Sequence, residues 1–300
     1  MFSSRKELLF VYSVKDANPN GDPLNANHPR YDDETQQALV SDVRIKRTVR
    51  DEFLRKNHDV FIDGEPKTLN NRIKELKEKL GTESSEETLK KCIDTRLFGV
   101  TFALGNDSFA WTGPVQFKWG RSLHKVKVEF VQGTGAFLSK ETSEQRTIRN
   151  EYKVPFALIA TYAIANENAS KTTDATDEDF KAMVNALWDG TNNLVTRSKT
   201  EHRSRFLMVI EYNDDYNNHI GSLDEKVLIT KPDGSKFTED EELSIRKMED
   251  LTLDITKIVE KIPVQSVKKV SVYKDSDTKV KGIEELKEKL GDGKIELIIR

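Results

Sequence analysis

The 300-residue sequence contains a single cysteine, Cys92, and only five histidines. One cysteine excludes a disulfide within the chain and is typical of a protein from a reducing compartment. Protein zinc sites use cysteines and histidines at short, fixed spacings, and the histidines here stand far apart along the chain. We therefore expect no metal site, no cofactor and a cytoplasmic location.

Long hydrophobic runs are also missing. The longest nearly apolar stretch, residues 154–165, is too short to cross a bilayer and contains Pro155. The first 13 residues lack the charged, apolar and cleavage regions of a signal peptide. With 33% charged residues and a mean hydropathy of −0.64, the chain is predicted to be a polar globular protein without a membrane partner.

The net charge of −3 argues against a protein that is basic over its whole surface. Residues 213–262 hold 13 Asp and Glu against 7 Lys and Arg, so the rest of the chain is positive overall. Its basic residues also occur in clusters. The composition therefore leaves nucleic-acid binding through a local basic surface open, without establishing it.

Motifs of known catalytic sites are scarce. The sequence has no Walker-type phosphate loop and no nucleophile elbow. Asp22, Asp32 and Asp33 lie near a basic segment, where carboxylates can hold a divalent cation against a phosphodiester. Most acidic loop residues only form turns, so turn formation is the favoured role of these carboxylates, with metal-dependent cleavage of a phosphodiester as the alternative.

The periodicity of apolar residues predicts an α+β fold. Residues 7–14, 123–131, 154–166 and 205–212 are predicted strands, and residues 42–56 and 177–189 are predicted amphipathic helices. This order is expected of a split βαβ, ferredoxin-like domain with insertions. The charged residues 68–98 suggest a helical insertion. Residues 132–153 lack a clear period and suggest an extended arm.

Residues 18–50 join a loop rich in Asn, Pro, Gly and Asp to the start of a basic helix. Loop amides and helix N-terminal N–H groups can bind phosphate, and on a helical wheel Lys46, Arg47 and Arg50 share an arc apart from the apolar stripe. The alternatives are simple turn chemistry for the loop and a solvated cationic face for the helix. The candidate polyanion-binding residues here are Asn20, Arg30, Ser41, Arg44, Lys46, Arg47 and Arg50.

Two further segments are basic. The arm carries Phe137, Arg146 and Arg149, and a basic loop with an exposed aromatic side chain can stack on bases. The alternative is a flexible surface hairpin. Lys199 and Arg203 precede the strand at 205–212, where they suit phosphate contact.

Four segments together resemble the Cas-seven family, the backbone subunits of CRISPR effector complexes, and are most similar to the type I-B and I-C branch. They are the loop and basic helix of residues 18–51, RLFGVTFAL at 96–104, GPVQFKWGRSLHKV at 113–126, which includes Arg121, and VPFALIATYAIAN at 154–166. The resemblance extends over roughly residues 7–212 and does not reach residues 213–300.

The resemblance implies a modified RNA-recognition-motif palm built from residues 1–66, 99–131 and 154–300. It also implies a helical insertion at 67–98 and a projecting thumb at 132–153. In the family, copies of the subunit stack head to tail along a guide RNA and grip its phosphate–sugar backbone. By motif match, the helix with Ser41, Lys46, Arg47 and Arg50 would do so here, after the loop with Asn20 and Arg30.

The implied function is non-catalytic. The guide RNA would pair with one strand of target DNA in antiviral defence, so that base pairing supplies the specificity. The implied partners are the guide RNA, the target strand, other copies of the chain, a large subunit, and Cas-five-type and Cas-six-type subunits. In the related type III branch an aspartate in an early loop cleaves target RNA, which is the alternative for this chain.

Overall fold

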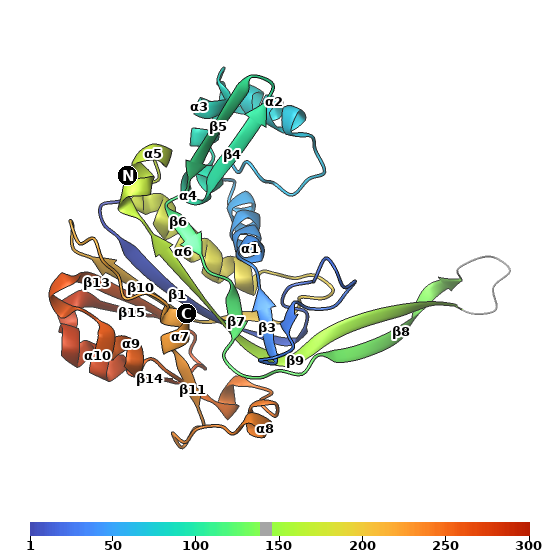
Figure 1. Cartoon of the computed structure of the whole chain (residues 1–300), viewed down its shortest axis with the longest axis vertical. Helices are drawn as coiled ribbons and strands as arrows, with labels where there is room; N and C mark the ends of the chain where they lie inside the picture. The colour runs from blue at the N-terminus through green and yellow to red at the C-terminus, as the bar shows by residue number, and fades with distance from the viewer. Residues whose placement is uncertain (139–145) are drawn as a thin grey trace.

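The computed structural model describes residues 1–138 and 146–300 and has a ten-stranded sheet at its centre (Figure 1). Strand β1 (Lys6–Ala17) pairs antiparallel with β9 (Arg146–Ala165) on one side and with β10 (His202–Tyr212) on the other. The sheet runs in the order β15–β13–β10–β1–β9–β7–β3–β2, and β6 and β8 also pair with β9. The remaining strands are β2 (Tyr31–Asp32), β3 (Gln37–Val40), β6 (Val115–Phe117), β7 (Gly120–Ser122), β8 (Glu129–Leu138), β13 (Val267–Lys274) and β15 (Ile295–Ile299).

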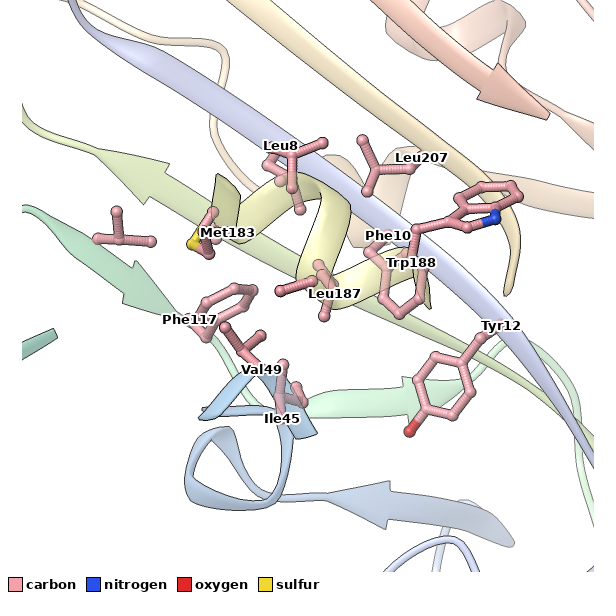
Figure 2. Packing of buried hydrophobic residues seen from close by; sticks show 14 of the residues in the cluster. Leu8, Phe10, Tyr12, Ile45, Val49, Phe117, Met183, Leu187, Trp188 and Leu207 are labelled. Atoms are coloured by element: carbon pink, nitrogen blue, oxygen red, sulfur yellow. The ribbon is translucent and has the colours of Figure 1, made fainter. Parts of the chain in front are cut away.

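Helices α1 (Asp42–Arg55) and α6 (Asp177–Asn192) cover one face of this sheet. Side chains alternate between the faces of a strand, so Leu8, Phe10 and Tyr12 of β1 all point into the core beneath these helices (Figure 2). Leu187 of α6 and Ile45 of α1 belong to the same cluster of buried side chains (Figure 2). The predicted strands and helices at 7–14, 42–56, 154–166, 177–189 and 205–212 are confirmed. The strand predicted at 123–131 is wrong over residues 123–128, and its last three residues begin β8.

The parts of residues 213–300 outside strands β13 and β15 cover the opposite face of the sheet, where Leu9 and Val11 of β1 are buried in a second core. This part of the chain has helices α7 (Leu223–Lys226), α8 (Glu239–Glu242), α9 (Thr256–Lys261) and α10 (Ile283–Leu290), and three-residue 3₁₀ helices at Met248–Asp250, Val264–Ser266 and Asp292–Lys294. A second sheet joins β11 (Leu228–Thr230), β12 (Thr252–Asp254) and β14 (Val280–Lys281).

The buried Glu7 fastens this second layer to β1. Its carboxylate accepts hydrogen bonds from the Tyr162 hydroxyl at 2.7 Å and from the backbone N–H groups of Ile220 at 2.8 Å and Gly221 at 2.7 Å. The Tyr212 hydroxyl donates to it as well. A buried carboxylate is tolerated only when donors surround it in this way.

The insertion after α1 forms a third core. It contains α2 (Leu69–Leu80), α3 (Ser85–Lys91) and α4 (Ile93–Phe98), followed by the hairpin of β4 (Gly99–Leu104) and β5 (Asp107–Thr112). Phe102 and Trp111 of the hairpin pack with Leu76 and Leu89 of the helices. The expected boundary at residue 98 therefore separates elements that share one core, because the aromatic side chains of β4 and β5 face the insertion.

Strand β8 and the first part of β9 form a two-stranded arm that projects from the body (Figure 1). Helix α5 (Glu167–Thr173) follows β9 at the opposite end of that strand. Within residues 1–138 and 146–300, the helices are too short or too polar to span a bilayer.

Candidate nucleic-acid interface

The loop between β1 and β2 is held by its own hydrogen bonds and by its neighbours. The N–H of Asn18 donates to the carbonyl of Ser198 at 2.8 Å, which ties the loop to the segment before β10. The buried Asn20 accepts hydrogen bonds at Oδ1 from the N–H of Ser41 at 2.8 Å and its hydroxyl at 2.9 Å. Ser41 in turn caps α1. Asn20 and Ser41 thus position the loop against the helix, and both are buried.

The loop carboxylates are engaged in turns. Asp22 accepts from the N–H of Leu24 at 3.1 Å, and Asp32 accepts from the N–H of Thr35 at 3.2 Å and from Arg121 at 2.9 Å. The hydrogen bond from Arg121 and those from Thr35 lower the pKa of Asp32 to about 2. Nowhere in residues 1–138 and 146–300 do three His, Cys, Asp or Glu side chains gather as metal ligands.

The cationic arc on α1 faces the insertion, and its most C-terminal member is buried. Arg50 donates from Nε to Asp94 at 2.8 Å, and the two side chains are only 9% and 0% exposed. Lys46 pairs with Asp42 at 3.0 Å and is 11% exposed. The prediction that Arg50 is available to a ligand is therefore wrong, because the helical insertion packs over that side of α1 and supplies the carboxylate.

Arg47 belongs to the same arc and is also engaged. It pairs with Asp51 and donates to the carbonyl of Ile62 at 3.2 Å, while its guanidinium lies against Gly64. These contacts hold Arg47 on the segment that leads into the insertion. Arg47 and Lys46 keep part of their surface open, so the structure reduces their availability without removing it.

Arg44 lies beside this arc, and its guanidinium is 3.9 Å from Asp51, the carboxylate that Arg47 also pairs with. Its guanidinium hydrogen-bonds to Thr48 Oγ1 at 2.9 Å, and it lines a cavity of about 20 Å³ together with Tyr12 and His202. Such a cavity has room for about one water molecule. Among the described residues, nothing hydrogen-bonds to Arg44 Nε or to either ring nitrogen of His202, although all three atoms are buried.

A groove of about 380 Å³ opens beside this cluster, between the loop, the base of the arm and the segment before β10. We call it the cationic groove. Its charged residues are Arg149, Arg197, Lys199 and Glu151, and the amides of Asn18 and Asn27 also line it. Both arginines share Glu151, at 2.5 Å and 3.6 Å. The groove thus holds three cations and one carboxylate.

Burial and like charge act on the basic side chains at the rear of the groove. Burial, with the nearby charge of Arg44, lowers the pKa of Lys199 to about 8. Burial, with the charges of Lys199 and Arg44, lowers the pKa of His202 to about 3. Positive groups that outnumber their carboxylates, here Asp51 at 3.9 Å from Arg44 and Glu151 in the groove, are stabilised when an anion arrives, because it offers both charge and hydrogen-bond acceptors.

Three predicted residues lie elsewhere. Arg30 stacks on the half-exposed Trp119 at 5.3 Å, and Arg121 lies on the neighbouring strand β7, where it pairs with Asp32. Arg203 lies on the opposite side of β10 from His202 and lines a different cavity. The side chains of Phe137 and Arg146 fall outside the described part of the structure.

The sequence does not predict three residues of this region, which are Tyr152, His202 and Trp119. Tyr152 lines the cationic groove and contacts His28 and Phe130 with ring centroids 4.8 Å and 5.1 Å apart. No local spacing marks these residues, because each gains its position from contacts with distant segments. The pairing of the exposed Phe130 with the half-buried Tyr152 follows from the cross-strand register of the arm, which the sequence alone does not specify.

Comparison with known proteins identifies the family. The family model described as CRISPR-associated protein Cas7 matches residues 4–256. The chain belongs to this family. The match confirms the resemblance seen in the sequence and extends it from residue 212 into the acidic segment. The CRISPR-associated protein Cas7 of Haloferax volcanii is 27% identical over 288 residues, which cover 86% of this chain and 82% of that protein.

Solved structures share the fold. A chain of a "CRISPR RNA-guided surveillance complex, pre-nicking" superposes with a TM-score of 0.56 at 12% identity, over 90% of this chain and 92% of that one. A chain of a "CRISPR RNA-guided surveillance complex" gives 0.50 at 15% identity, over 90% and 89%. The mixed arrangement of sheets and helices in this family member is thus also found in chains of such complexes.

Proposed function

We propose that this Cas7 family member is a non-catalytic backbone subunit that binds CRISPR guide RNA through the cationic groove. The observation that carries the proposal is the excess of positive charge in the groove, where Arg149, Arg197 and Lys199 meet a single carboxylate. The phosphates of RNA supply the missing negative charge. The family membership supports guide RNA as the particular polyanion.

The palm would be a modified RNA-recognition motif. Strands β10, β1, β9 and β7 lie side by side in that order, and α1 and α6 cover one face, as in a ferredoxin-like domain. RNA-recognition motifs stack bases on the open face of the sheet. Residues 213–300 cover that face here, so the RNA would run past the strand ends, where the cationic groove lies.

Binding of this kind grips the backbone and leaves the bases free. Contacts to phosphate set the register without reading sequence. The exposed bases would then pair with one strand of target DNA, and further copies of the chain would continue along the guide. The arm of β8 and β9 would be the thumb that interrupts the guide between copies, and Cas-five-type, Cas-six-type and large subunits would complete the complex.

The test is binding of a fluorescent 30-nucleotide RNA at several salt concentrations. Replacing Arg149, Arg197 and Lys199 by Glu should weaken binding by about a hundredfold, since each of the three charged contacts is worth roughly 1 kcal/mol. The control variant carries Glu at Lys74, Lys236 and Lys257, which lie outside the groove, and should bind within about threefold of the wild type. Equal losses in both variants would show attraction to net charge alone and contradict the proposed site.

Assembly is tested separately. Wild-type protein mixed with the RNA should elute from size-exclusion chromatography as particles larger than one chain with one RNA, and the RNA should remain intact with Mg²⁺ present. Cleavage of a complementary RNA, lost on replacing Asp22 or Asp32 by Ala, would refute the non-catalytic assignment.

A further inference from the structure

A second groove, of about 480 Å³, lies on the layer formed by residues 213–300, far along the chain from the residues of the cationic groove. Consecutive residues 227–230, which include strand β11, line it together with Phe237 and Leu123. The groove thus lies along strand β11. We call it the edge groove.

Strand β11 is an edge strand of the second sheet. It pairs with β12 on one side, and no strand in the described part of the chain pairs with its other side. An unpaired edge offers backbone N–H and C=O groups to another extended segment. The apolar side chains beside it are partly open, since Leu228 is 37% exposed and Ile229 and Phe237 are half-buried.

The charges at the edge groove are unequal. Asp254 pairs with Lys281 at 3.1 Å, and Glu242 accepts from the neutral backbone N–H of Lys125 at 2.8 Å and keeps its negative charge. Lys236 and Lys257 also line the groove, are exposed, and meet no carboxylate within ion-pair distance among residues 1–138 and 146–300. The groove is therefore cationic at its rim although residues 213–262 are acidic overall.

We propose that the edge groove is a docking site for an extended acidic segment of a partner protein. The segment adds a strand to the free edge of β11, places an apolar side chain between Leu228 and Phe237, and pairs a carboxylate with Lys236 or Lys257. The site is independent of the cationic groove, so it can fail or succeed apart from the proposed RNA binding.

The probe is a fluorescein-labelled peptide of sequence EVEVEV, titrated with the full chain and followed by anisotropy. Two comparison peptides separate the contributions. KVKVKV keeps the apolar side chains and reverses the charge, and a fully N-methylated EVEVEV keeps both but cannot donate backbone hydrogen bonds. We expect saturable binding of EVEVEV and affinities at least about tenfold lower for the other two.

Substitutions in the protein test where the peptide binds. Leu228→Asp, and Lys236→Glu with Lys257→Glu, should each weaken EVEVEV at least about tenfold. The matched controls are Leu297→Asp, at a side chain 38% exposed on the edge strand β15, and Lys74→Glu on α2, and both should bind as the wild type does. All substituted side chains are exposed, and thermal unfolding of each variant is the check that it folds.

Three results would overturn the proposal: no saturable binding of EVEVEV, equal binding of KVKVKV, or equal losses in the control variants. RNA affinity measured on the same variants separates the two sites. The double variant Lys236→Glu with Lys257→Glu should keep its RNA affinity within about threefold of the wild-type value. A large loss of RNA affinity without loss of peptide binding would assign the edge groove to RNA instead.

Discussion

RNA binding should weaken as the pH rises through the pKa of Lys199. In the free protein, burial and Arg44 hold this pKa at about 8, far below the usual value for lysine. A phosphate in the cationic groove stabilises the charged ammonium, so binding takes up a proton and the neutral side chain opposes it. With a pKa of about 8, the side chain is about nine-tenths protonated at pH 7 and about one-tenth at pH 9.

The expected result is a loss of about tenfold in RNA affinity between pH 7 and pH 9, from this group alone. The assay is fluorescence anisotropy with an RNA of adenosine and cytidine only, whose bases keep one protonation state over this range. Ionic strength is held constant because phosphate contacts are strongly salt-dependent. Lys199→Met should bind more weakly at pH 7 and lose the pH dependence, and Lys199→Arg should bind with little change up to pH 9.

Lys74→Met serves as the control, since Lys74 is an exposed lysine of the insertion, and it should retain the wild-type profile. A tenfold decline that persists in Lys199→Met would show that another group titrates. A flat profile in the wild-type protein would show that Lys199 does not face the phosphate. Either result would refute the assignment of this side chain.

Three other predictions concern Arg50, Asn20 and Asp32. Arg50→Met should lower the free energy of unfolding in urea by about 3–5 kcal/mol, because it leaves Asp94 buried without its cation, while RNA affinity stays unchanged; RNA loss at full stability would contradict this. Asn20→Ala should lower the free energy of unfolding by about 1–3 kcal/mol and speed amide exchange at Ser41, because Ser41 loses the acceptor of two hydrogen bonds. An unchanged exchange rate would contradict the role of Asn20 in anchoring the loop to α1. Asp32→Asn should lower the melting temperature at neutral pH. The lowered pKa of Asp32 means that its stabilisation is present above the unfolded pKa and is lost as the pH falls from about 4 to about 2, so the two proteins should converge there. A constant difference over that range would contradict the ion pair with Arg121.

Local periodicity predicts the elements but not the environment of their polar faces. The stripe of Ile45, Val49 and Phe53 predicts α1 to within one residue of its end, since apolar spacing reports the buried side directly. The wheel also separates Arg50 from that stripe. It cannot reveal that Asp94, 44 residues later in the chain, is brought against Arg50 by the insertion.

The cationic groove cannot be predicted from the sequence for the same reason. The residues of the groove come from three segments of the chain, the first with Asn18 and Asn27, the second with Arg149, and the third with Arg197 and Lys199. More than a hundred residues separate the first two segments, and more than forty separate the last two. The antiparallel pairing of β1 with β9 and β10 brings them together. The basic residues of each segment are visible in the sequence. Which of them share a site depends on sheet register, and that places Lys199 in the groove and Arg203 on the other side of β10.

The most direct test of the central claim is to locate bound RNA on the protein by photo-crosslinking and mass spectrometry. An RNA that contains 4-thiouridine is bound at low salt, irradiated and digested, and the crosslinked peptides are identified. RNA in the cationic groove should crosslink to residues 18–30, to residues 149–152, which include Tyr152, and to residues 197–202. Crosslinks confined to the side of α1 that carries Lys46 and Arg47, or to residues 213–300, would contradict the account.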